Sequence, residues 1–160
     1  MRIKVDENIR LEKLELYHAD TLFVLQTENK LHLAKWLGLA EQDMAYGAIV
    51  ENIANSDPND LNFVIQYQGK IVGRIDLHDI TKAAAKIGYW IDENHSGKGI
   101  VTKSVKKLTE YGFKTLGLNQ LQIWCKGGNE KSKAVAKRSG FVNTNQSEHE
   151  FNLVVYIKNV

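Results

Sequence analysis

The stretch Trp90-Ile91-Asp92-Glu93-Asn94-His95-Ser96-Gly97-Lys98-Gly99-Ile100-Val101 carries the most information about the fold. An apolar run at 87–91 predicts a strand, a polar turn with two glycines follows, and a helix is expected from Gly97 to about Leu116. The first amides of a helix have no intrahelical partner, and the helix dipole favours negative charge there. Glycines let an anion approach the backbone. The sequence therefore predicts an anion site where this helix begins, with Lys98 at its rim.

The rest of the chain alternates strand-like and helix-like patterns on both sides of this stretch. We expect strands at 9–16, 61–67, 71–77, 87–91, 121–125, 141–145 and 151–158, and helices at 17–29, 41–55, 97–116 and 130–139, while 30–39 is a short segment whose type the pattern leaves open. Three consecutive strands joined by short turns predict an antiparallel meander, and the later strand–helix–strand unit predicts a parallel crossover. We therefore expect one domain over residues 1–160 with a mixed α/β (α+β) fold. Its central sheet should be mixed, mostly antiparallel, with about six to seven strands and helices on both faces.

Composition excludes several classes of protein. The formal net charge is only +2, from 21 basic and 19 acidic residues, which argues against a dedicated DNA-binding protein. The one cysteine, Cys125, excludes an internal disulfide and fits a reducing compartment. The sequence shows no signal-peptide pattern and no apolar run of about 20 residues, so we expect a cytoplasmic protein without a membrane partner.

Basic residues nonetheless concentrate in the second half of the chain and favour a small anionic ligand there. They are Lys98, Lys103, Lys106, Lys107, Lys126, Lys131, Lys133, Lys137 and Arg138. The phosphate-binding P-loop pattern is absent from the sequence, and the dinucleotide fingerprint would need a glycine where Thr102 stands. A Gly-x-Gly pair alone is also typical of a helix start that binds no ligand. The surrounding sequence is therefore needed to distinguish these two interpretations.

That surrounding sequence resembles the GCN5-related N-acetyltransferase (GNAT) superfamily. Its acetyl-CoA motif, [Q/R]-x-x-G-x-[G/A], corresponds to residues 94–99, with Asn94 at the position where Gln or Arg is usual. A closer likeness is to the RimJ/RimL-type ribosomal-protein N-acetyltransferases and extends over about residues 87 to 141. It rests on four ordered blocks, which are Ile87-Gly88-Tyr89-Trp90-Ile91, Gly97-Lys98-Gly99-Ile100-Val101-Thr102, Asn129-Glu130-Lys131-Ser132-Lys133-Ala134 and Ser139-Gly140-Phe141.

The resemblance implies acetyl-CoA as cosubstrate and acetyl transfer to a primary amine, such as the N-terminal α-amine of a ribosomal or other protein. The spacing of the histidines and the cysteine predicts no metal. The resemblance also implies a coenzyme site formed by Trp90, Ile91, Asn94, His95, Ser96, Gly97, Lys98, Gly99, Ile100, Val101, Asn129 and Ser132. The backbone N–H of Trp90 or Ile91 would face the thioester carbonyl, and Ser132 would hydrogen-bond the leaving sulfur.

The base that takes the amine proton is less defined by the sequence. Glu150 is the first candidate, and the alternatives are His149, His78, Asp76 and Glu93. The segment 31–53, with Trp36, Met44 and Tyr46, is expected to line the acceptor cleft.

Other functions stay open at this point. The chain could be a non-catalytic acyl-CoA-binding or sensing module, a protein-interaction domain on the same fold, or an acetyltransferase for a polyamine, antibiotic or metabolite. The acceptor and the oligomeric state, a homodimer included, are not defined by the sequence. His18, His32 and His95 form no metal-ligand spacing with Cys125, which is expected to be a small apolar filler.

Overall fold

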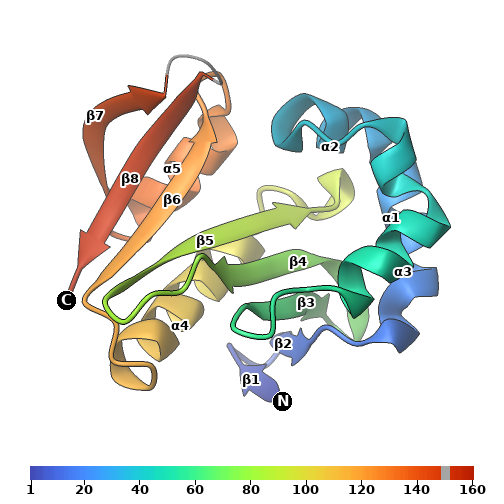
Figure 1. Cartoon of the computed structure of the whole chain (residues 1–160), viewed down its shortest axis with the longest axis horizontal. Coiled ribbons are helices and arrows are strands. Elements are labelled where there is room, and N and C mark those ends of the chain that lie inside the picture. The colour runs from blue at the N-terminus through green and yellow to red at the C-terminus, as the bar shows by residue number, and fades with distance from the viewer. Residues whose placement is uncertain (149–151) are drawn as a thin grey trace.

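The computed structural model describes residues 1–148 and 152–160 and contains an eight-stranded sheet with helices on both faces (Figure 1). The strands are β1 (Arg2–Lys4), β2 (Ile9–Lys13), β3 (Leu61–Tyr67), β4 (Lys70–His78), β5 (Ala84–Ile91), β6 (Gln120–Lys126), β7 (Val142–Glu148) and β8 (Leu153–Asn159). The α-helices are α1 (Ala19–Glu28), α2 (Lys30–Leu37), α3 (Tyr46–Ala54), α4 (Ile100–Lys114) and α5 (Glu130–Arg138), with 3-10 turns η1 (Leu16–His18), η2 (Glu41–Met44) and η3 (Glu93–His95). Within these residues, no helix combines the length and the apolar character that crossing a membrane requires.

The sheet has the order β1-β2-β3-β4-β5-β6-β8-β7. All neighbouring strands are antiparallel except β5 and β6, which are parallel and joined through α4. The expected antiparallel meander is β3-β4-β5, and the expected crossover is β5-α4-β6. The predicted fold class is therefore confirmed.

Two apolar cores lie on opposite faces of the sheet. One packs α4 and α5 against the sheet, with Val105, Leu108 and Ala136 fully buried. The other packs α1, α2 and α3 against the opposite face and includes Trp90. Because side chains alternate along a strand, the adjacent Tyr89 packs against the first core instead. Strand β5 thus contributes to both layers.

The structure departs from the sequence-based expectation in three places, the first of which is the segment 30–37, whose type the sequence left open and which forms the helix α2. The described residues form one strand more than the upper expected number, because the short β1 pairs with β2, Ile3 lying opposite Leu11. The helix expected at 41–55 is interrupted, since Ala45 is extended with ψ of 147°. The preceding turn is held by the Asp43 carboxylate, which accepts the Ala40 N–H at 2.7 Å.

Candidate active site

The sheet splits between its two parallel strands. β5 and β6 pair only from Ala84 to Lys86, opposite Gln120 to Gln122, and then separate (Figure 1). A cavity of about 490 Å³ lies at this split, lined by both strands, by the loop that leads into α4, by α5 and by α2. The carboxyl ends of parallel strands are a common place for a ligand site.

The loop before α4 presents free backbone amides to this cavity. Gly97 and Gly99 have φ of 81° and 75°, in the left-handed region that suits glycine. A Cβ built on either glycine meets no atom within 4 Å, so the space above both is open. The Lys103 N–H donates to Gly99 O at 3.0 Å as the first bond of α4, which leaves the amides of residues 100–102 before the helical ladder. This arrangement suits a phosphate.

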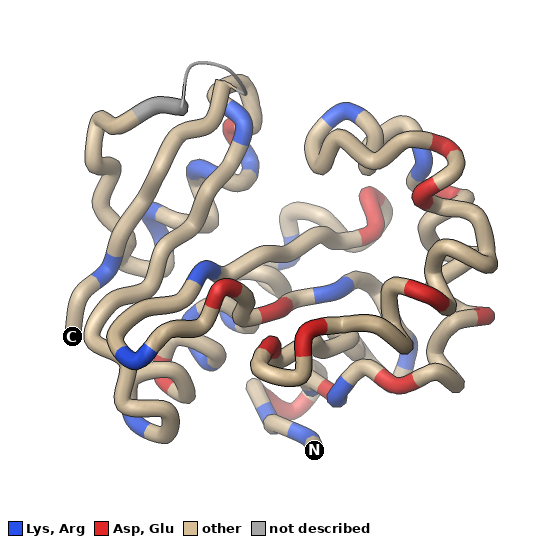
Figure 2. Tube along the Cα trace, viewed as in Figure 1, with Lys and Arg blue, Asp and Glu red and all other residues tan. Residues whose placement is uncertain are grey.

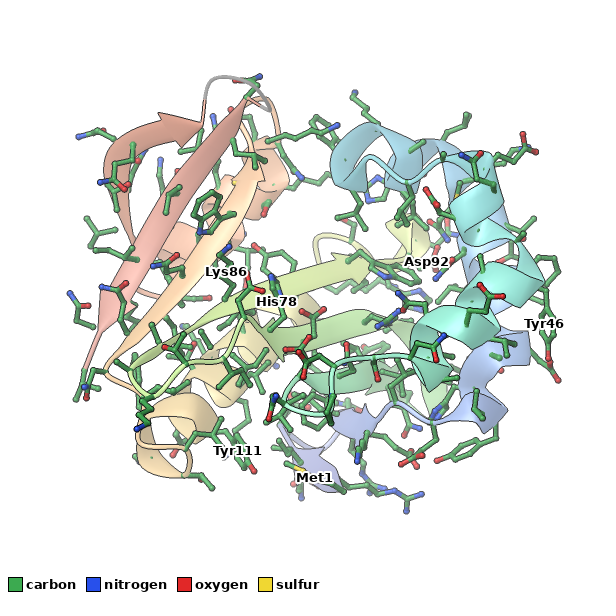
Figure 3. The ribbon with its side chains drawn as sticks, in the orientation of Figure 1. Met1, Tyr46, His78, Lys86, Asp92 and Tyr111 are labelled. Carbon is green, nitrogen blue, oxygen red and sulfur yellow. The ribbon has the colours of Figure 1, made fainter. Side chains whose placement is uncertain are left out.

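A buried carboxylate holds the same loop in place. One oxygen of Asp92 accepts from Asn29 Nδ2 at 3.0 Å, and the other lies 2.7 Å from His95 Nδ1. The amide oxygen of Asn29 accepts the Glu93 N–H at 3.0 Å. Burial raises the pKa of Asp92, but hydrogen bonds from His95, Asn29 and the Asn94 amide outweigh it, and the pKa lies below its ordinary value. Figure 3 shows Asp92 at the end of β5, beside the layer of α1–α3.

The end of β5 also turns one amide toward the split. Asp92 N–H donates to Val72 O of β4 at 2.8 Å. Successive amides of an extended strand point to opposite edges, so the N–H of Trp90 points toward β4 as well, and the N–H of Ile91 points toward β6. Of the two amides expected to face a thioester carbonyl, Ile91 is the one with the suitable direction.

The side chains of Tyr89, Ser132 and Cys125 converge on the inner side of the cavity. Ser132 is held in place by the N-cap of α5, because Asn129 Oδ1 accepts the Ser132 N–H at 3.1 Å. The Tyr89 hydroxyl lies 2.8 Å from Ser132 Oγ and 3.2 Å from Ser132 O, so its one proton has two acceptors within reach. Burial raises the pKa of the Cys125 thiol, an effect that a hydrogen bond with Ser132 partly offsets. A phenol, a hydroxyl and a thiol therefore meet where β5, β6 and α5 come together.

Helix α2 forms the wall opposite α5. Its cavity-lining residues are His32, Leu33, Trp36 and Leu37. Lys126 Nζ, at the end of β6, donates to Lys35 O of α2 at 2.9 Å. A Cβ built on Gly128 would lie 3.8 Å from the Trp36 ring, so the turn after β6 also approaches α2. α2 therefore spans the split and closes one side of the cavity.

Segment 31–53, expected to line the acceptor cleft, reaches this cavity only through α2. Trp36 lines the cavity as predicted. Met44 is instead buried in the core under α1–α3. Tyr46 is exposed, and its hydroxyl donates to Asp20 at 2.8 Å. The break at Ala45 turns this part of the segment away from the cavity.

Most of the coenzyme residues expected from the sequence line this one cavity. They are Trp90, Ile91, His95, Ser96, Gly97, Gly99, Ile100, Val101, Asn129 and Ser132. Asn94 and Lys98 belong to the same loop but are exposed and are not part of the lining. Glu150 and His149 lie outside the described residues.

Of the other base candidates, Asp76 and His78 lie apart from the cavity lining. Asp76 Oδ2 and His78 Nδ1 are 2.6 Å apart on β4. The carboxylate of Glu93 lies 3.3 Å from Nδ1 of His32, which lines the cavity.

Sequence reasoning missed His32 and Tyr89 as cavity residues. Tyr89 could have been found from its place beside Trp90, whereas nothing in the sequence connects His32 to Glu93.

The cavity fits a long ligand with phosphate at one end and a reactive group near Ser132. Its lining joins open amides at the α4 start to apolar strand residues and then to the Ser132 hydroxyl. Several blue Lys and Arg segments lie in the region of α5 in Figure 2, and the helix contains Lys131, Lys133, Lys137 and Arg138. Over residues 1–148 and 152–160, no group of three or more His, Cys, Asp or Glu side chains is arranged to hold a metal ion.

Comparison with known proteins assigns the family. Residues 8–142 match the family model described as the acetyltransferase (GNAT) domain. The chain is 37% identical over 147 residues to YdaF of Bacillus subtilis (strain 168), a protein provisionally named as a ribosomal N-acetyltransferase, with 87% of this chain and 80% of YdaF covered. It is 28% identical over 147 residues to the ribosomal-protein-serine acetyltransferase of Escherichia coli (strain K12), covering 88% and 82% of the two chains.

A solved structure agrees with these relatives. The microcin C7 self-immunity acetyltransferase MccE, solved in complex with acetyl-CoA and AMP, superposes with a TM-score of 0.87 and 31% identity over 99% of this chain and 96% of that chain. The family model, the YdaF similarity and this superposition agree with the split sheet and the glycine turn. The chain therefore belongs to the GNAT family of acetyltransferases.

Proposed function

We propose that residues 1–160 form one acyl-CoA N-acyltransferase domain that moves the acetyl group of acetyl-CoA to the N-terminal α-amine of a protein. The observation that carries this proposal is that the free amides at the start of α4 and the Ser132 hydroxyl open into the same cavity. A ribosomal protein is the favoured acceptor, because YdaF and the Escherichia coli relative are both named for ribosomal substrates.

The coenzyme would be held from its phosphate end. The amides of residues 100–102, together with Gly97 and Gly99, would bind the pyrophosphate, and exposed Lys98 would add positive charge at the rim. Asn29 and Asp92 keep this loop in its shape. The Asn129 cap holds the start of α5, and with it Ser132, at the inner end of the cavity.

Acetyl-CoA supplies the acetyl group as a thioester, and the residues of this chain act on the charges that develop. The Ile91 N–H, which points into the split, would stabilise negative charge on the carbonyl oxygen. An N–C bond forms while the C–S bond breaks, so the amine loses one proton to a base and the sulfur gains a hydrogen bond from Ser132 Oγ. Glu150 remains the first predicted base, and His32, whose Nδ1 lies 3.3 Å from the Glu93 carboxylate, is a further candidate among the described cavity residues.

The test has two stages. Calorimetric titration with coenzyme A should show binding, and a thiol-release assay should then show turnover with peptides that carry a free N-terminal serine or alanine. Mass spectrometry should find one acetyl group on the peptide N-terminus, and a matched peptide with a blocked N-terminus should give no product. Binding without turnover on any amine would favour the non-catalytic sensing module.

Small amines complete the acceptor panel. If spermidine or an amino sugar is acetylated and the peptides are not, the protein acceptor is wrong and a small-molecule acceptor replaces it. Cytoplasmic location, the absence of a metal, of DNA and of a membrane partner, and a homodimer all remain predictions. Sedimentation of the purified protein would measure its oligomeric state.

A further inference from the structure

The Tyr89 hydroxyl contacts Ser132, the residue proposed to face the leaving sulfur. This hydroxyl lies 2.8 Å from Ser132 Oγ and 3.2 Å from Ser132 O, and its one proton can be donated to either oxygen. Tyr89 belongs to β5 and Ser132 to α5, and both side chains line the cavity. The contact therefore joins the strand that presents the Ile91 amide to the helix that presents the serine hydroxyl.

Proton counting shows why this contact matters. A phenol and a serine hydroxyl each carry one proton. If the phenol donates to Ser132 Oγ, the serine proton is free to point into the cavity. If the phenol donates to Ser132 O instead, the serine donates to the phenol oxygen, and the serine proton is not available to a ligand in the cavity. The direction of one hydrogen bond thus decides whether Ser132 can donate to a sulfur atom.

The surroundings favour the productive direction when a thiolate is present. A negative sulfur beside Ser132 attracts the serine proton, and the phenol then turns its own proton onto the Oγ lone pair. Burial raises the pKa of Tyr89 well above its ordinary value, so the phenol keeps its proton across the working pH range. Tyr89 is consequently a neutral donor to Ser132 and is not the acid that protonates the leaving group.

We infer that Tyr89 is a positioning residue that directs the Ser132 hydroxyl proton toward the leaving sulfur. The inference rests on the proposed function, because it requires Ser132 to face that sulfur. Tyr89 orients and polarises the donor without touching the reacting atoms. Its removal should therefore slow turnover and leave the binding of acetyl-CoA almost unchanged.

A double-mutant cycle tests the inference on the full chain with acetyl-CoA and the acceptor found above. Tyr89→Phe removes one hydroxyl, keeps the ring, and should lower kcat about fivefold to tenfold, the effect of one lost hydrogen bond. The KM for acetyl-CoA should stay within about twofold. Ser132→Ala should lower kcat at least as much, and the double variant should be no slower than Ser132→Ala alone.

The control is Tyr111→Phe, on α4 and far from the split in Figure 3, which should have wild-type kcat. Coenzyme A affinity, measured by calorimetry, confirms that each variant is folded with an intact cavity. Multiplicative losses in the double variant would overturn the inference, because Tyr89 would then act independently of Ser132. A wild-type kcat for Ser132→Ala would overturn it together with the serine role, while acetyl transfer itself would stand.

Discussion

Asn29 and Asp92 are 63 residues apart in the sequence and joined by a buried hydrogen bond of 3.0 Å. Asn29 lies between α1 and α2, and Asp92 begins the loop that leads to α4. The bond thus connects the helix that spans the split to the loop that presents the free amides. Both walls of the cavity are fixed to one another at this point.

Replacing Asn29 should therefore affect both stability and coenzyme binding. In Asn29→Ala, the Asp92 carboxylate loses a donor and the Glu93 N–H loses its acceptor. We expect the free energy of unfolding to fall by about 2–3 kcal/mol, because the buried Asp92 carboxylate and the partly buried Glu93 N–H both lose a partner. Urea denaturation measures this loss, and calorimetry should show weaker coenzyme A binding. Asn55→Ala, at an exposed helix end, is the control and should change stability by less than about 0.5 kcal/mol.

Gly99→Glu should abolish coenzyme binding in a protein that still folds. The side chain has room, since a Cβ at Gly99 meets nothing within 4 Å, but its negative charge would occupy the proposed phosphate position. Gly69→Glu is a matched control, because Gly69 has φ of 80°, equally open space, and a position in the turn between β3 and β4. Both variants should lose about 1 kcal/mol through the left-handed backbone, and only Gly99→Glu should lose affinity. Equal coenzyme affinity in the two variants would refute the phosphate assignment.

Gly73→Ala tests the support beneath the end of β5. A Cβ on Gly73 would overlap the backbone oxygen of Trp90 and come within 2.9 Å of Ile91 Cα. The strand must shift, and the Ile91 amide shifts with it, so we expect a loss of about 1–3 kcal/mol in stability and a lower kcat. Thermal unfolding and turnover are the two measurements. Gly47→Ala, on α3 with no atom within 4 Å of the new Cβ, should be neutral or stabilising by less than about 1 kcal/mol.

The His78–Asp76 pair predicts a pH dependence of stability. The hydrogen bond to Asp76 raises the pKa of His78 above its ordinary value of 6.5, against the effect of burial, and Asp79 and Asp60 raise it further. Because the folded pKa exceeds the unfolded one, the stabilisation is complete below about pH 6.5 and disappears as pH rises through the folded value. NMR titration of the imidazole protons should show the raised pKa, and Asp76→Asn should lower it. Lys86, opposite His78 in register and beside it in Figure 3, also bonds Asp79, so Lys86→Gln should raise the pKa of His78.

The local patterns in the sequence were sufficient to predict the central part of the fold. The apolar run before Gly97 and the amphipathic helix after Gly99 obey short-range rules, and the structure has both. The start of α4 at Ile100, later than expected, follows from the left-handed φ of the two glycines. The short β1 strand was missed because its three residues carry too little pattern and depend on β2 for pairing.

The sequence predicted those site residues that lie within one continuous segment. It did not predict the residues that packing brings together from distant segments. Ser132 and the glycine turn belong to recognisable blocks, and both line the cavity. His32 reaches the cavity only because α2 packs across the split. Alternation along β5 predicts that Tyr89 and Trp90 face opposite sides, but only the packed helices decide which side contains Ser132.

The separation of β5 from β6 gives the molecule two inward-facing strand edges. Residues 87–91 and 123–126 each keep one side without a neighbouring strand, and α2 crosses above them through the Lys126–Lys35 contact. On an outer surface such edges would invite another protein to add a strand. Enclosed between helices, they admit only a thin, extended molecule whose own amides can pair with them. The gap in the sheet therefore selects ligands by their width, and α2 shields both strand edges from pairing with the sheet of another protein.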